Sequence, residues 1–415
     1  MLGEDEMRIA LVSKDYPPTK HLGGIGTQTY HLAHGLAGLG HEIHVITISP
    51  DMDCRHEERS QGVSIIRTTE YPGPKNNMPL SEWITHSAKI ASEVWTLHSK
   101  NPVDLVKFAD YQGEGFVHLM NREYSNLIPT VIQLHAPIID TPEHWPETYQ
   151  EVIRLAIAQE GVSLRLADAI CSNCGWNSDW AAKRYGLRRE RIPTIHAGVD
   201  TDLFSPRQDV LKEERPTIVF VGRITKEKGC DLLVKAACKL AVEYPDLQLW
   251  LIGRVLADSF QDELRETARA FPNLLRFCGH IERQDLPAYL CRAHVFGFAP
   301  VFETGPSNAC LEAMACGLPI IITRVGGMPE MVMHEETGFV IPPGDLEALV
   351  VALRRLISDE ALRANMGKRA RDYTVNTYDR HKCLRRMEAF YKAVANGVDD
   401  FEGKPILHPG EKALS

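Results

Sequence analysis

Residues 217–229 read TIVFVGRITKEKG, and this stretch decides the fold class. Thr217–Val221 is a short apolar run rich in β-branched residues, which is typical of a buried strand. A glycine and several charged residues follow, and a helical pattern then covers Asp231–Glu243. A strand that leads directly into a helix is the repeating unit of a parallel sheet with helices on both faces.

The same alternation of strand and helix patterns extends along nearly the whole chain. The other expected strands are Arg8–Val12, His41–Ile48, Val63–Ile66, Val103–Phe108, Thr130–Leu134, Ala169–Ser172, Leu247–Ile252, Leu274–Cys278, Val295–Ala299 and Leu318–Ile322. The other expected helices lie around Tyr30–Leu39, Glu147–Leu166, Gln261–Ala270, Leu286–Arg292, Ser307–Cys316 and Arg371–Ala395.

The alternation breaks at Gly198–Arg215, where polar and charged residues predict a linker. The sequence therefore predicts an α/β protein with two doubly wound domains, residues 1–204 and 205–375. Ligands of such sheets bind beyond the carboxyl ends of the strands. Two domains of this kind that face each other would form a cleft, which is the usual place for a ligand site.

Composition excludes several classes of protein. The chain has 415 residues, with 46 Lys+Arg against 55 Asp+Glu, and a formal net charge of −9. We expect no nucleic-acid partner, because polybasic binders need a basic face to neutralise phosphates. The longest apolar runs have the length of strands and fall well short of the roughly 20 residues of a membrane-spanning helix. The first residues, MLGEDEMRIALVS, carry acids where a secretory signal carries basic residues, so we expect a cytoplasmic protein.

The cysteines do not indicate a metal or redox centre. Most of the ten lie within apolar runs, which is typical of reduced and buried thiols. Cys171 and Cys174 have the CxxC spacing, but no second CxxC and no HxxxH motif accompany them.

Two loops that precede helical patterns carry groups suited to an anion. Gly23–Thr29 reads GGIGTQT, and glycines ahead of a helix expose N–H groups to an anion. These letters approach a dinucleotide fingerprint without its third glycine, so a purely structural turn is the alternative. In the second loop, Arg223 and Lys228 lie between a strand end and a helix start, where two cations suit a diphosphate. A solvated basic turn is the alternative there.

Residues 303–319, ETGPSNACLEAMACGLP, combine a helix start with two acids. The helix is expected to open at Gly305, Pro306, Ser307 and Asn308. Its free N–H groups would then be available to a ligand. Glu312 lies about two turns further on among apolar residues, and a buried acid needs a partner such as a sugar or ribose hydroxyl. The alternative is that Glu303 is a loop acid and that Glu312 pairs with a neighbouring lysine.

His135 ends the expected strand Thr130–Leu134 and begins a loop. A histidine at the carboxyl end of a parallel strand lies where such sheets place ligands. The alternative is a strand-end histidine that is satisfied by backbone groups.

Taken together, these motifs resemble those of the family 4 glycosyltransferases, which belong to the GT-B superfamily of retaining nucleotide-sugar enzymes. The resemblance runs from Arg8 to about Tyr391. The motifs that carry it are YPP and GGIG within 16–26, LGHEIHVIT at 39–47, LHA at 134–136, HAGVDTDLFSP at 196–206, FVGRITKEKG at 220–229, LIG at 251–253, FCGHIERQDLPAYL at 277–290 and ETGPSNACLEAMACGLPII at 303–321.

The resemblance implies roles for the residues that match family motifs in the second domain. Arg223 and Lys228 match the basic pair that holds the donor diphosphate, and Glu312 matches the acid that holds the donor ribose. Glu303 is similar to the acid that faces the transferred sugar. The family usually has seven residues between the two acids, whereas this chain has eight, Thr304–Leu311, so the role of Glu303 is carried over less firmly.

Further roles follow from the same resemblance. His135 matches a histidine near the anomeric centre, Gly24 matches the glycine loop that approaches donor and acceptor, and Ile281 matches the position whose backbone reads the base. The resemblance places the acceptor in residues 1–204 and the nucleotide-sugar donor in 205–375. A C-terminal helix, about 376–415, is expected to pack back on the first domain.

The family implies a GT-B fold and retaining transfer from a nucleoside-diphosphate sugar, the co-substrate, to a hydroxyl acceptor. The acceptor would be a saccharide, a lipid-linked molecule or a small molecule. No cofactor and no metal are expected, because Arg223, Lys228 and the helix start would stabilise the leaving diphosphate. Asp51-Met-Asp53 spells DxD, the metal motif of the unrelated GT-A class, but it lies far along the sequence from the diphosphate motif and is interpreted as a surface turn.

Three other functions are alternatives. The incomplete glycine motif disfavours an NAD-dependent dehydrogenase. A GT-B nucleotide-sugar epimerase would lack the helix motif of Glu312, and a non-catalytic nucleotide-sugar binding protein would not need every site residue. The basic cluster consists of Lys183, Arg184, Arg188, Arg189 and Arg191. It would suit anionic lipid, but the net charge favours a solvated helix end, so peripheral membrane contact is not favoured.

Overall fold

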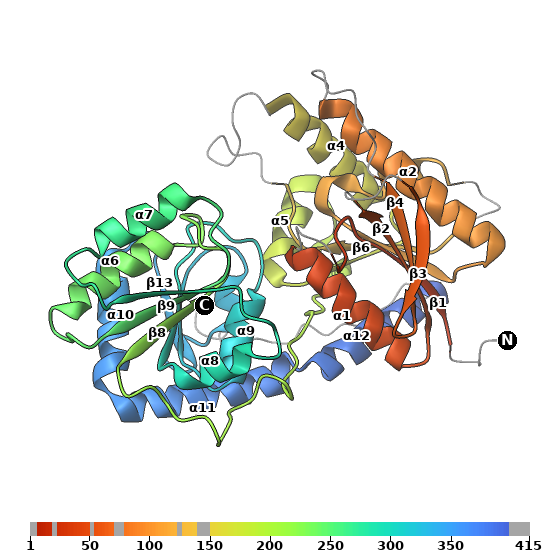
Figure 1. Cartoon of the computed structure of the whole chain (residues 1–415). Coiled ribbons are helices and arrows are strands. Elements are labelled where there is room, and N and C mark those ends of the chain that lie inside the picture. The colour runs from red at the N-terminus through yellow and green to blue at the C-terminus, as the bar shows by residue number, and fades with distance from the viewer. Residues whose placement is uncertain are drawn as a thin grey trace. The chain divides into compact units, whose positions relative to one another are not determined.

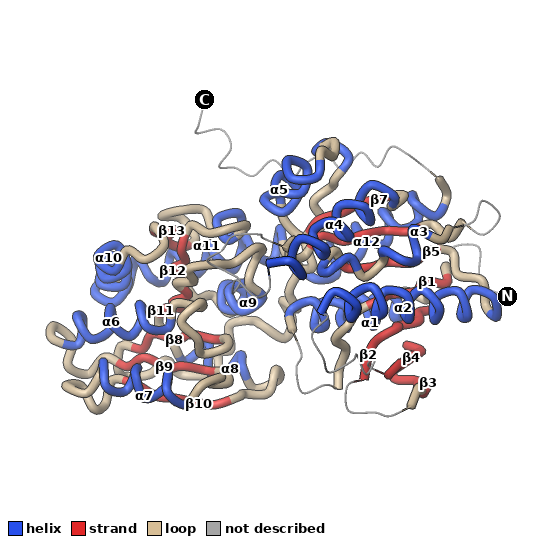
Figure 2. The backbone as a smooth tube through the Cα atoms, turned by 90° about the horizontal axis from the view of Figure 1, so that it is seen from above, coloured by secondary structure: helices blue, strands red, loops and turns tan. Residues whose placement is uncertain are grey.

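The computed structural model describes residues 6–18, 23–49, 54–69, 79–122, 127–138 and 150–397 (Figures 1 and 2). The chain divides into two compact units. Unit 1 contains the described residues up to Ala197 together with 383–397, and unit 2 contains Gly198–Lys382. Each unit has its own largely parallel sheet, which confirms the predicted α/β class.

The sheet of unit 1, over the described residues, has seven strands in the order β3-β4-β2-β1-β5-β6-β7. They are β1 (Arg8–Val12), β2 (Glu42–Ser49), β3 (His56–Ser60), β4 (Val63–Thr69), β5 (Leu105–Ala109), β6 (Thr130–Leu134) and β7 (Ala169–Ser172). Neighbouring strands are parallel except β3 and β4, which are antiparallel at the edge.

Helices cover both faces of this sheet. They are α1 (Gly24–Gly38), α2 (Pro79–Lys100), α3 (Phe116–Met120), α4 (Gln150–Leu166), α5 (Gly175–Tyr185) and α12 (Arg380–Ala395). Along β1, Ile9 and Leu11 pack in one cluster with Leu36 of α1, whereas Ala10 and Val12 pack in another with α2. This alternation follows from the period of two in a strand and leaves β1 buried on both sides.

The sheet of unit 2 has six strands among the described residues, in the order β10-β9-β8-β11-β12-β13, and all neighbours are parallel. They are β8 (Thr217–Val221), β9 (Gln248–Ile252), β10 (Leu275–Gly279), β11 (Val295–Phe298), β12 (Ile320–Thr323) and β13 (Gly338–Ile341). The helices are α6 (Cys230–Ala241), α7 (Asp258–Thr267), α8 (Leu286–Arg292), α9 (Asn308–Ala315), α10 (Leu346–Ser358) and α11 (Glu360–Thr377).

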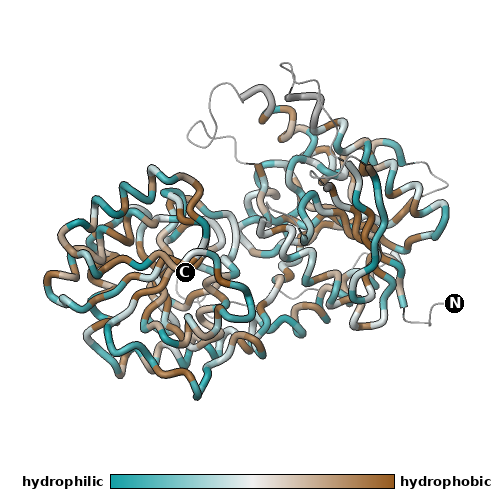
Figure 3. Tube along the Cα trace, viewed as in Figure 1, coloured by the Kyte–Doolittle hydropathy of each residue, from teal (hydrophilic) through white to brown (hydrophobic). Residues whose placement is uncertain are grey.

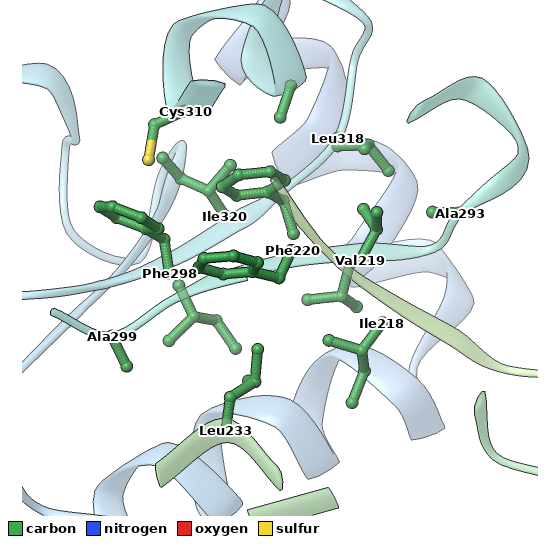
Figure 4. Packing of buried hydrophobic residues seen from close by; sticks show 14 of the residues in the cluster. Ile218, Val219, Phe220, Leu233, Ala293, Phe298, Ala299, Cys310, Leu318 and Ile320 are labelled. Atoms are coloured by element: carbon green, nitrogen blue, oxygen red, sulfur yellow. The ribbon is translucent and has the colours of Figure 1, made fainter. Parts of the chain in front are cut away.

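Helices of unit 2 form two groups, with α6 in contact with α7 and α10, and α9 in contact with α8 and α11. Hydrophobic residues concentrate along the strands between them (Figure 3). The rings of Phe220 on β8 and Phe298 on β11 stack with centroids 5.7 Å apart, and Leu233 of α6 lies in the same packing (Figure 4). The two central strands are therefore packed together just before the loops that follow them.

Both sheets have a topological switch point. In unit 2 the chain runs outward from β8 through β9 to β10, and then returns to β11 on the other side of β8. In unit 1 the corresponding reversal lies between β1 and β5. The loops after these strands diverge at the carboxyl edge, which is where open parallel sheets bind ligands.

The C-terminal helical pattern differs from the prediction of one long helix over Arg371–Ala395. It forms two helices, α11 and α12, which are separated at Tyr378 and Asp379. The backbone N–H of Val199 donates to the carbonyl of Tyr378 (2.7 Å), and that of Arg380 donates to the carbonyl of Val199 (2.9 Å). This pairing with a distant segment replaces helical hydrogen bonds and interrupts the helix.

The segment that follows Ala197 is not a loose linker. Phe204 is fully buried in the core of unit 2, and Asp200 forms an ion pair with Arg380 at 2.7 Å. Arg371 Nη1 donates to the carbonyls of Thr201 (3.0 Å) and Phe204 (2.6 Å). The start of the predicted linker is therefore fixed to unit 2, and the unit boundary falls at Ala197 rather than after residue 204.

Helix α12 belongs to unit 1 although it follows unit 2 in the chain (Figure 1). Its buried residues in the unit 1 core are Leu384, Met387, Phe390 and Tyr391. A Cβ at Gly35 of α1 would lie 2.8 Å from Leu384 Cδ2, so α1 and α12 are in close contact. The polar contact between His41 Nε2 and Glu388 Oε1, at 3.2 Å, adds to this packing.

We expect Met387→Ala to destabilise the protein by about 2–5 kcal/mol, because it removes a 3%-exposed side chain from a packed core. The matched control is Arg386→Ala on the exposed face of the same helix, which should change stability by about 0.5 kcal/mol or less. Chemical denaturation measures both. Equal effects of the two variants would contradict the packing of α12 in unit 1.

Candidate functional site

The loops after β8 and β11 are locked together at the switch point of unit 2. Gly229 has a φ of +73°, and a Cβ there would lie 1.8 Å from the carbonyl oxygen of Ala299. The backbone N–H of Val301 donates to the carbonyl of Glu227 at 3.0 Å. Only glycine permits this approach, so residue 229 fixes the position of its neighbour, Lys228.

Lys228 and Glu303 form an ion pair across this junction. Lys228 comes from the loop after β8 and Glu303 from the loop after β11, and their side chains are 17% and 21% exposed. The Lys228 ammonium also lies 5.9 Å from the centre of the Phe298 ring. The structure therefore brings together two residues that the sequence predicted separately.

Arg223 supplies a further positive charge on the loop after β8. It lies just after β8, and its side chain is exposed. Within the described part of the chain, its guanidinium has no hydrogen bond or ion pair. A cation without an internal partner at the carboxyl edge of a parallel sheet is available to an anionic ligand.

The start of α9 has N–H groups that no side chain caps in the described part of the chain. Ser307 is the N-cap, and among the described residues no side-chain hydrogen bond caps the helix there. The first turn of a helix has N–H groups without intrahelical partners, and these favour an anion. Of the predicted helix start, Asn308 is the first residue of α9, whereas Gly305 and Pro306 precede the N-cap.

The loop after β12 contacts the backbone of Glu303 and Thr304. Gly326 has a φ of +50°, and a Cβ there would lie 1.9 Å from the carbonyl oxygen of Glu303. The N–H of Gly327 donates to the carbonyl of Thr304 at 3.0 Å. The loop after β12 thus fixes the backbone of the loop that carries Glu303.

Glu312 lies on α9 with a side chain only 8% exposed, and its partner is Arg283. Arg283 Nη1 donates to Glu312 Oε1, and its guanidinium lies 4.8 Å from the centre of the Phe204 ring. Burial raises the pKa of Glu312, and the charge of Arg283 partly offsets this. The partner expected from the sequence was a ligand hydroxyl or a lysine, and Arg283 was missed although it lies within the FCGHIERQDLPAYL motif.

Ile281 lies in the same loop as Arg283, after β10, and is half-buried against the core of unit 2. A cavity of about 430 Å³ opens beside it, lined by Ile224, Gly253 and His280 among others. These residues follow β8, β9 and β10, so the cavity lies at the carboxyl edge of the sheet. A larger cavity of about 920 Å³ lies in unit 1 near the amino ends of β6 and β7, and none of the predicted site residues lines it.

His135 directly follows β6 in unit 1 and is buried. Its backbone N–H donates to Asp110 Oδ1 at 3.0 Å, and its Nε2 lies 3.4 Å from Lys107 Nζ. Burial and the charge of Lys107 lower the pKa of His135 well below its ordinary value, so the imidazole is neutral at pH 7. The sequence predicted His135 but neither Lys107 nor Asp110 as its neighbours.

The pKa values of Lys107 and Asp110 are also shifted. Burial lowers the pKa of Lys107 to about 8 and raises the pKa of Asp110 to about 6. Hydrogen bonds from the backbone of His135 and Ala136 oppose the shift of Asp110. Clusters of perturbed titratable groups at a strand end are typical of functional sites.

Gly24 is the first residue of α1, and Gly23 is its N-cap. A Cβ at Gly24 would meet nothing within 4 Å, whereas one at Gly26 would lie 2.5 Å from the carbonyl oxygen of Asp15. The structural need for glycine is therefore at Gly26. Gly24 instead leaves open space at the helix start.

Two motifs of the sequence have the spacing of metal ligands, CxxC at 171–174 and DxD at 51–53. Cys171 and Cys174 are buried free thiols. Within the described ranges, no three His, Cys, Asp or Glu side chains are grouped so that they could hold a metal ion. The Asp51-Met-Asp53 motif lies outside the described residues. None of the helices in those ranges combines the length and hydropathy of a bilayer-spanning segment.

Two families match consecutive parts of the chain. "Glycosyltransferase Family 4" matches residues 22–203, and "Glycosyl transferases group 1" matches residues 203–373. The chain belongs to the group 1 glycosyltransferases. The predicted family and the predicted enzyme class are thereby confirmed.

Two relatives match this chain over most of its length. The glycogen synthase of Mycobacterium tuberculosis (strain H37Rv) is 26% identical over 423 residues, covering 98% of this chain and 99% of its own. The D-inositol 3-phosphate glycosyltransferase of Corynebacterium aurimucosum is 25% identical over 400 residues, covering 88% of this chain and 91% of its own.

Solved structures identify the fold of this glycosyltransferase. Sucrose-phosphate synthase from Thermosynechococcus elongatus has a TM-score of 0.78 at 24% identity and covers 94% of this chain and 99% of its own. WaaG, a glycosyltransferase involved in lipopolysaccharide biosynthesis, has a TM-score of 0.70 at 18% identity and covers 92% and 99%. The predicted GT-B fold is confirmed.

We expect Arg283→Met to destabilise the glycosyltransferase by about 2 kcal/mol or more, because it leaves the buried Glu312 charge unpaired. Arg283 is 36% exposed, so the loss should stay below that of a fully buried pair. The double variant Arg283→Met/Glu312→Met should recover most of the loss in chemical denaturation.

The matched control is Arg269→Met, which breaks the exposed pair with Glu266. It should cost less than about 1 kcal/mol. Equal losses for Arg283→Met and Arg269→Met would show that Arg283 does not stabilise the Glu312 carboxylate.

Proposed function

We propose that this glycosyltransferase transfers a sugar from a nucleoside-diphosphate sugar to a hydroxyl acceptor, with retention of the anomeric configuration and without a divalent metal. The observation that carries the proposal is the convergence of positive groups at the switch point of unit 2. Arg223, Lys228 and the uncapped start of α9 all lie on the loops after β8 and β11.

Structural relatives support the choice of donor class. Anabaena Alr3699/HepE, with a TM-score of 0.74 and 18% identity, has been solved in complex with UDP. The same protein has also been solved in complex with UDP-glucose. A nucleotide sugar is therefore the donor class that we assign to this chain, without a choice of base or sugar.

Charge development explains how the site would work. As the bond to the anomeric carbon breaks, the leaving diphosphate gains negative charge. Arg223, Lys228 and the N–H groups of α9 would stabilise that charge where it forms, which is the part that a metal plays in other enzymes. Lys228 is held by Glu303, and its ammonium has further N–H donors for a phosphate oxygen.

Glu312 would bind the ribose of the donor. Its carboxylate is fixed by Arg283, and a carboxylate can accept hydrogen bonds from two neighbouring hydroxyls. The base would then lie toward Ile281, whose loop borders the 430 Å³ cavity. This arrangement gives each part of the donor a separate contact in unit 2.

His135 would contact the transferred sugar as a neutral imidazole. Because burial and Lys107 keep it uncharged, it would not repel a developing positive charge at the anomeric carbon. Within unit 2, Glu303 would face the transferred sugar. Within unit 1, Gly24 would leave open space at the start of α1.

We expect Lys228→Ala to lower turnover at saturating donor by about 10²–10³, because it removes a charge that stabilises the developing anion. Lys226→Ala, an exposed lysine of the same loop, is the matched control and should retain near-normal turnover. Release of nucleoside diphosphate measures both, and thermal unfolding checks that each variant is folded. Near-normal turnover of Lys228→Ala would show that Lys228 does not bind the diphosphate.

We also expect activity to survive exhaustive treatment with EDTA, because the cationic groups of the chain take the role of a metal. The same nucleoside diphosphate assay applies, with Mg²⁺ or Mn²⁺ added back as the comparison. Loss of activity with EDTA and recovery with either ion would refute metal independence while leaving the glycosyltransferase activity in place.

A further inference from the structure

The cavity of about 920 Å³ in unit 1 has no part in the glycosyl transfer proposed above. Pro129 and Asp168 line it, and these two residues directly precede β6 and β7. The cavity therefore lies at the amino edge of the sheet, whereas His135 follows β6 at the carboxyl edge. All of its described lining residues belong to unit 1. A volume of this order is that of a site for a small organic molecule.

One wall of the cavity contains Arg188 and Arg191, which belong to the basic cluster of the sequence. The backbone that follows them is fixed beside β7. The N–H of Ser172 donates to the carbonyl of Pro193 at 3.0 Å, and the N–H of Ile195 donates to the carbonyl of Ser172 at 2.7 Å. Both arginines are exposed, and within the described part of the chain neither guanidinium forms a hydrogen bond or an ion pair. Two cations beside a cavity are therefore available to an anionic ligand.

Arg122 lines the same cavity with a side chain that is only 11% exposed. Its Nη2 donates to Asp168 Oδ2 at 2.9 Å, and that oxygen also accepts from the backbone N–H of Thr130 at 2.7 Å. These bonds fix the guanidinium at the start of β6. Its Nε is buried and makes no hydrogen bond among the described residues. A buried N–H group without an acceptor costs free energy, which an anion in the cavity would recover.

The charged groups that line the cavity leave an excess of positive charge. Arg122 offsets Asp168, and the other charged residues of the described lining are Arg188, Arg191 and Glu190. A guanidinium presents its N–H donors in a planar fork that matches the oxygens of a phosphate. A phosphate monoester carries about two negative charges at pH 7 and has three acceptor oxygens, so it suits a site with three arginines.

Much of the remaining lining is apolar. Phe390 and Val394 come from α12, and Leu127 and Pro129 come from the segment before β6. Leu127 is 53% exposed, so a ligand beside it would remove apolar surface from water. Burial of apolar surface stabilises a bound ligand roughly in proportion to the area buried. The cavity therefore combines cationic groups with an apolar wall.

We propose that this cavity binds a phosphate monoester carried by an apolar group. The phosphate binds Arg188, Arg191 and the Nε–H of Arg122, and the apolar group packs against Leu127 and α12. A ligand with these contacts joins the edge of the sheet to α12 and stabilises the packing of that helix in unit 1. The same chemistry occurs in a soluble alkyl phosphate and in the headgroup region of phosphatidic acid.

Octyl phosphate below its micelle concentration is the probe, and isothermal titration calorimetry measures its binding to the full chain. Butyl phosphate, inorganic phosphate and the neutral octyl glucoside are the comparisons. We expect octyl phosphate to bind at least about ten-fold more tightly than each of them, because each buried CH₂ group tightens binding up to about four-fold. No binding of octyl phosphate, or equal affinity for octyl phosphate and octyl glucoside, would overturn the proposal.

The double variant Arg188→Gln/Arg191→Gln should weaken the binding of octyl phosphate by about ten-fold or more, because it removes two charged donors. Both residues are exposed, so the protein should remain folded, which thermal unfolding checks. The matched control is Lys183→Gln/Arg386→Gln. It removes two positive charges from exposed positions of unit 1 outside the described lining, and its affinity should stay within about two-fold of the native value. Equal weakening by the two double variants would overturn the site.

A phosphate ester could also bind the cations of unit 2, and Lys228→Ala distinguishes the two places. This variant should bind octyl phosphate within about two-fold of the native chain. Saturating octyl phosphate should slow backbone hydrogen exchange in 188–193 and 387–397 and leave 360–377 of unit 2 unchanged. Loss of binding in Lys228→Ala, or no protection in either segment of unit 1, would overturn the proposal.

Vesicles separate the two sources of the ligand. Phosphatidylcholine vesicles with and without phosphatidic acid are sedimented with the native chain and with Arg188→Gln/Arg191→Gln. Sedimentation that requires both phosphatidic acid and the two arginines would support the proposal with a lipid as the source. Binding of octyl phosphate without sedimentation would support it with a soluble ester as the source.

Discussion

The contact between the loops that follow β8 and β11 sets the geometry of the switch point of unit 2. Gly229 lies against the carbonyl of Ala299 at a distance that admits no side chain, and the ion pair of Lys228 with Glu303 closes the same junction. The stacked rings of Phe220 and Phe298 hold the two strands just before it. Positive groups from two distant parts of the chain are thereby fixed at one point, before any ligand is bound.

In unit 1, burial rather than an ion pair determines the charge of the titratable groups near the strand ends. Lys107 on β5, Asp110 after β5 and His135 after β6 lie close together. Burial is the main cause of the pKa shift of each. Burying such groups costs free energy, which the packing of the sheet between its two helical layers must offset. Helix α12 contributes to that packing, so the last described helix of the chain stabilises the sheet formed by its first strands.

Much of the fold could be predicted from the sequence, because buried parallel strands appear as continuous apolar runs. The bounds of Thr217–Val221, Thr130–Leu134 and Leu286–Arg292 agree with the structure. Helix α2, strand β13 and helix α10 were not predicted. The break between α11 and α12 was missed because it depends on pairing with Val199, which is far away in the sequence.

The candidate site was predictable to the extent that its residues follow strands. Arg223, Lys228, Glu303 and His135 were found because each lies at the carboxyl end of an apolar run. Partners could not be found in this way, because Arg283, just before α8, and Glu312, on α9, meet only when these two helices pack against each other. The burial of Lys107 inside a strand could not be predicted either, because a lysine in an apolar run can point to either face of the sheet.

Backbone hydrogen exchange in the presence of EDTA reports directly on ligand binding at the switch point of unit 2. We predict that saturating nucleoside diphosphate slows exchange in residues 222–229 and 303–309, the two locked loops and the start of α9. A control segment of the same unit, 360–377 on α11, should be unchanged. Protection that appears only when Mg²⁺ or Mn²⁺ is added, or that leaves both loops unaffected at saturation, would contradict a metal-free diphosphate site at the switch point of unit 2.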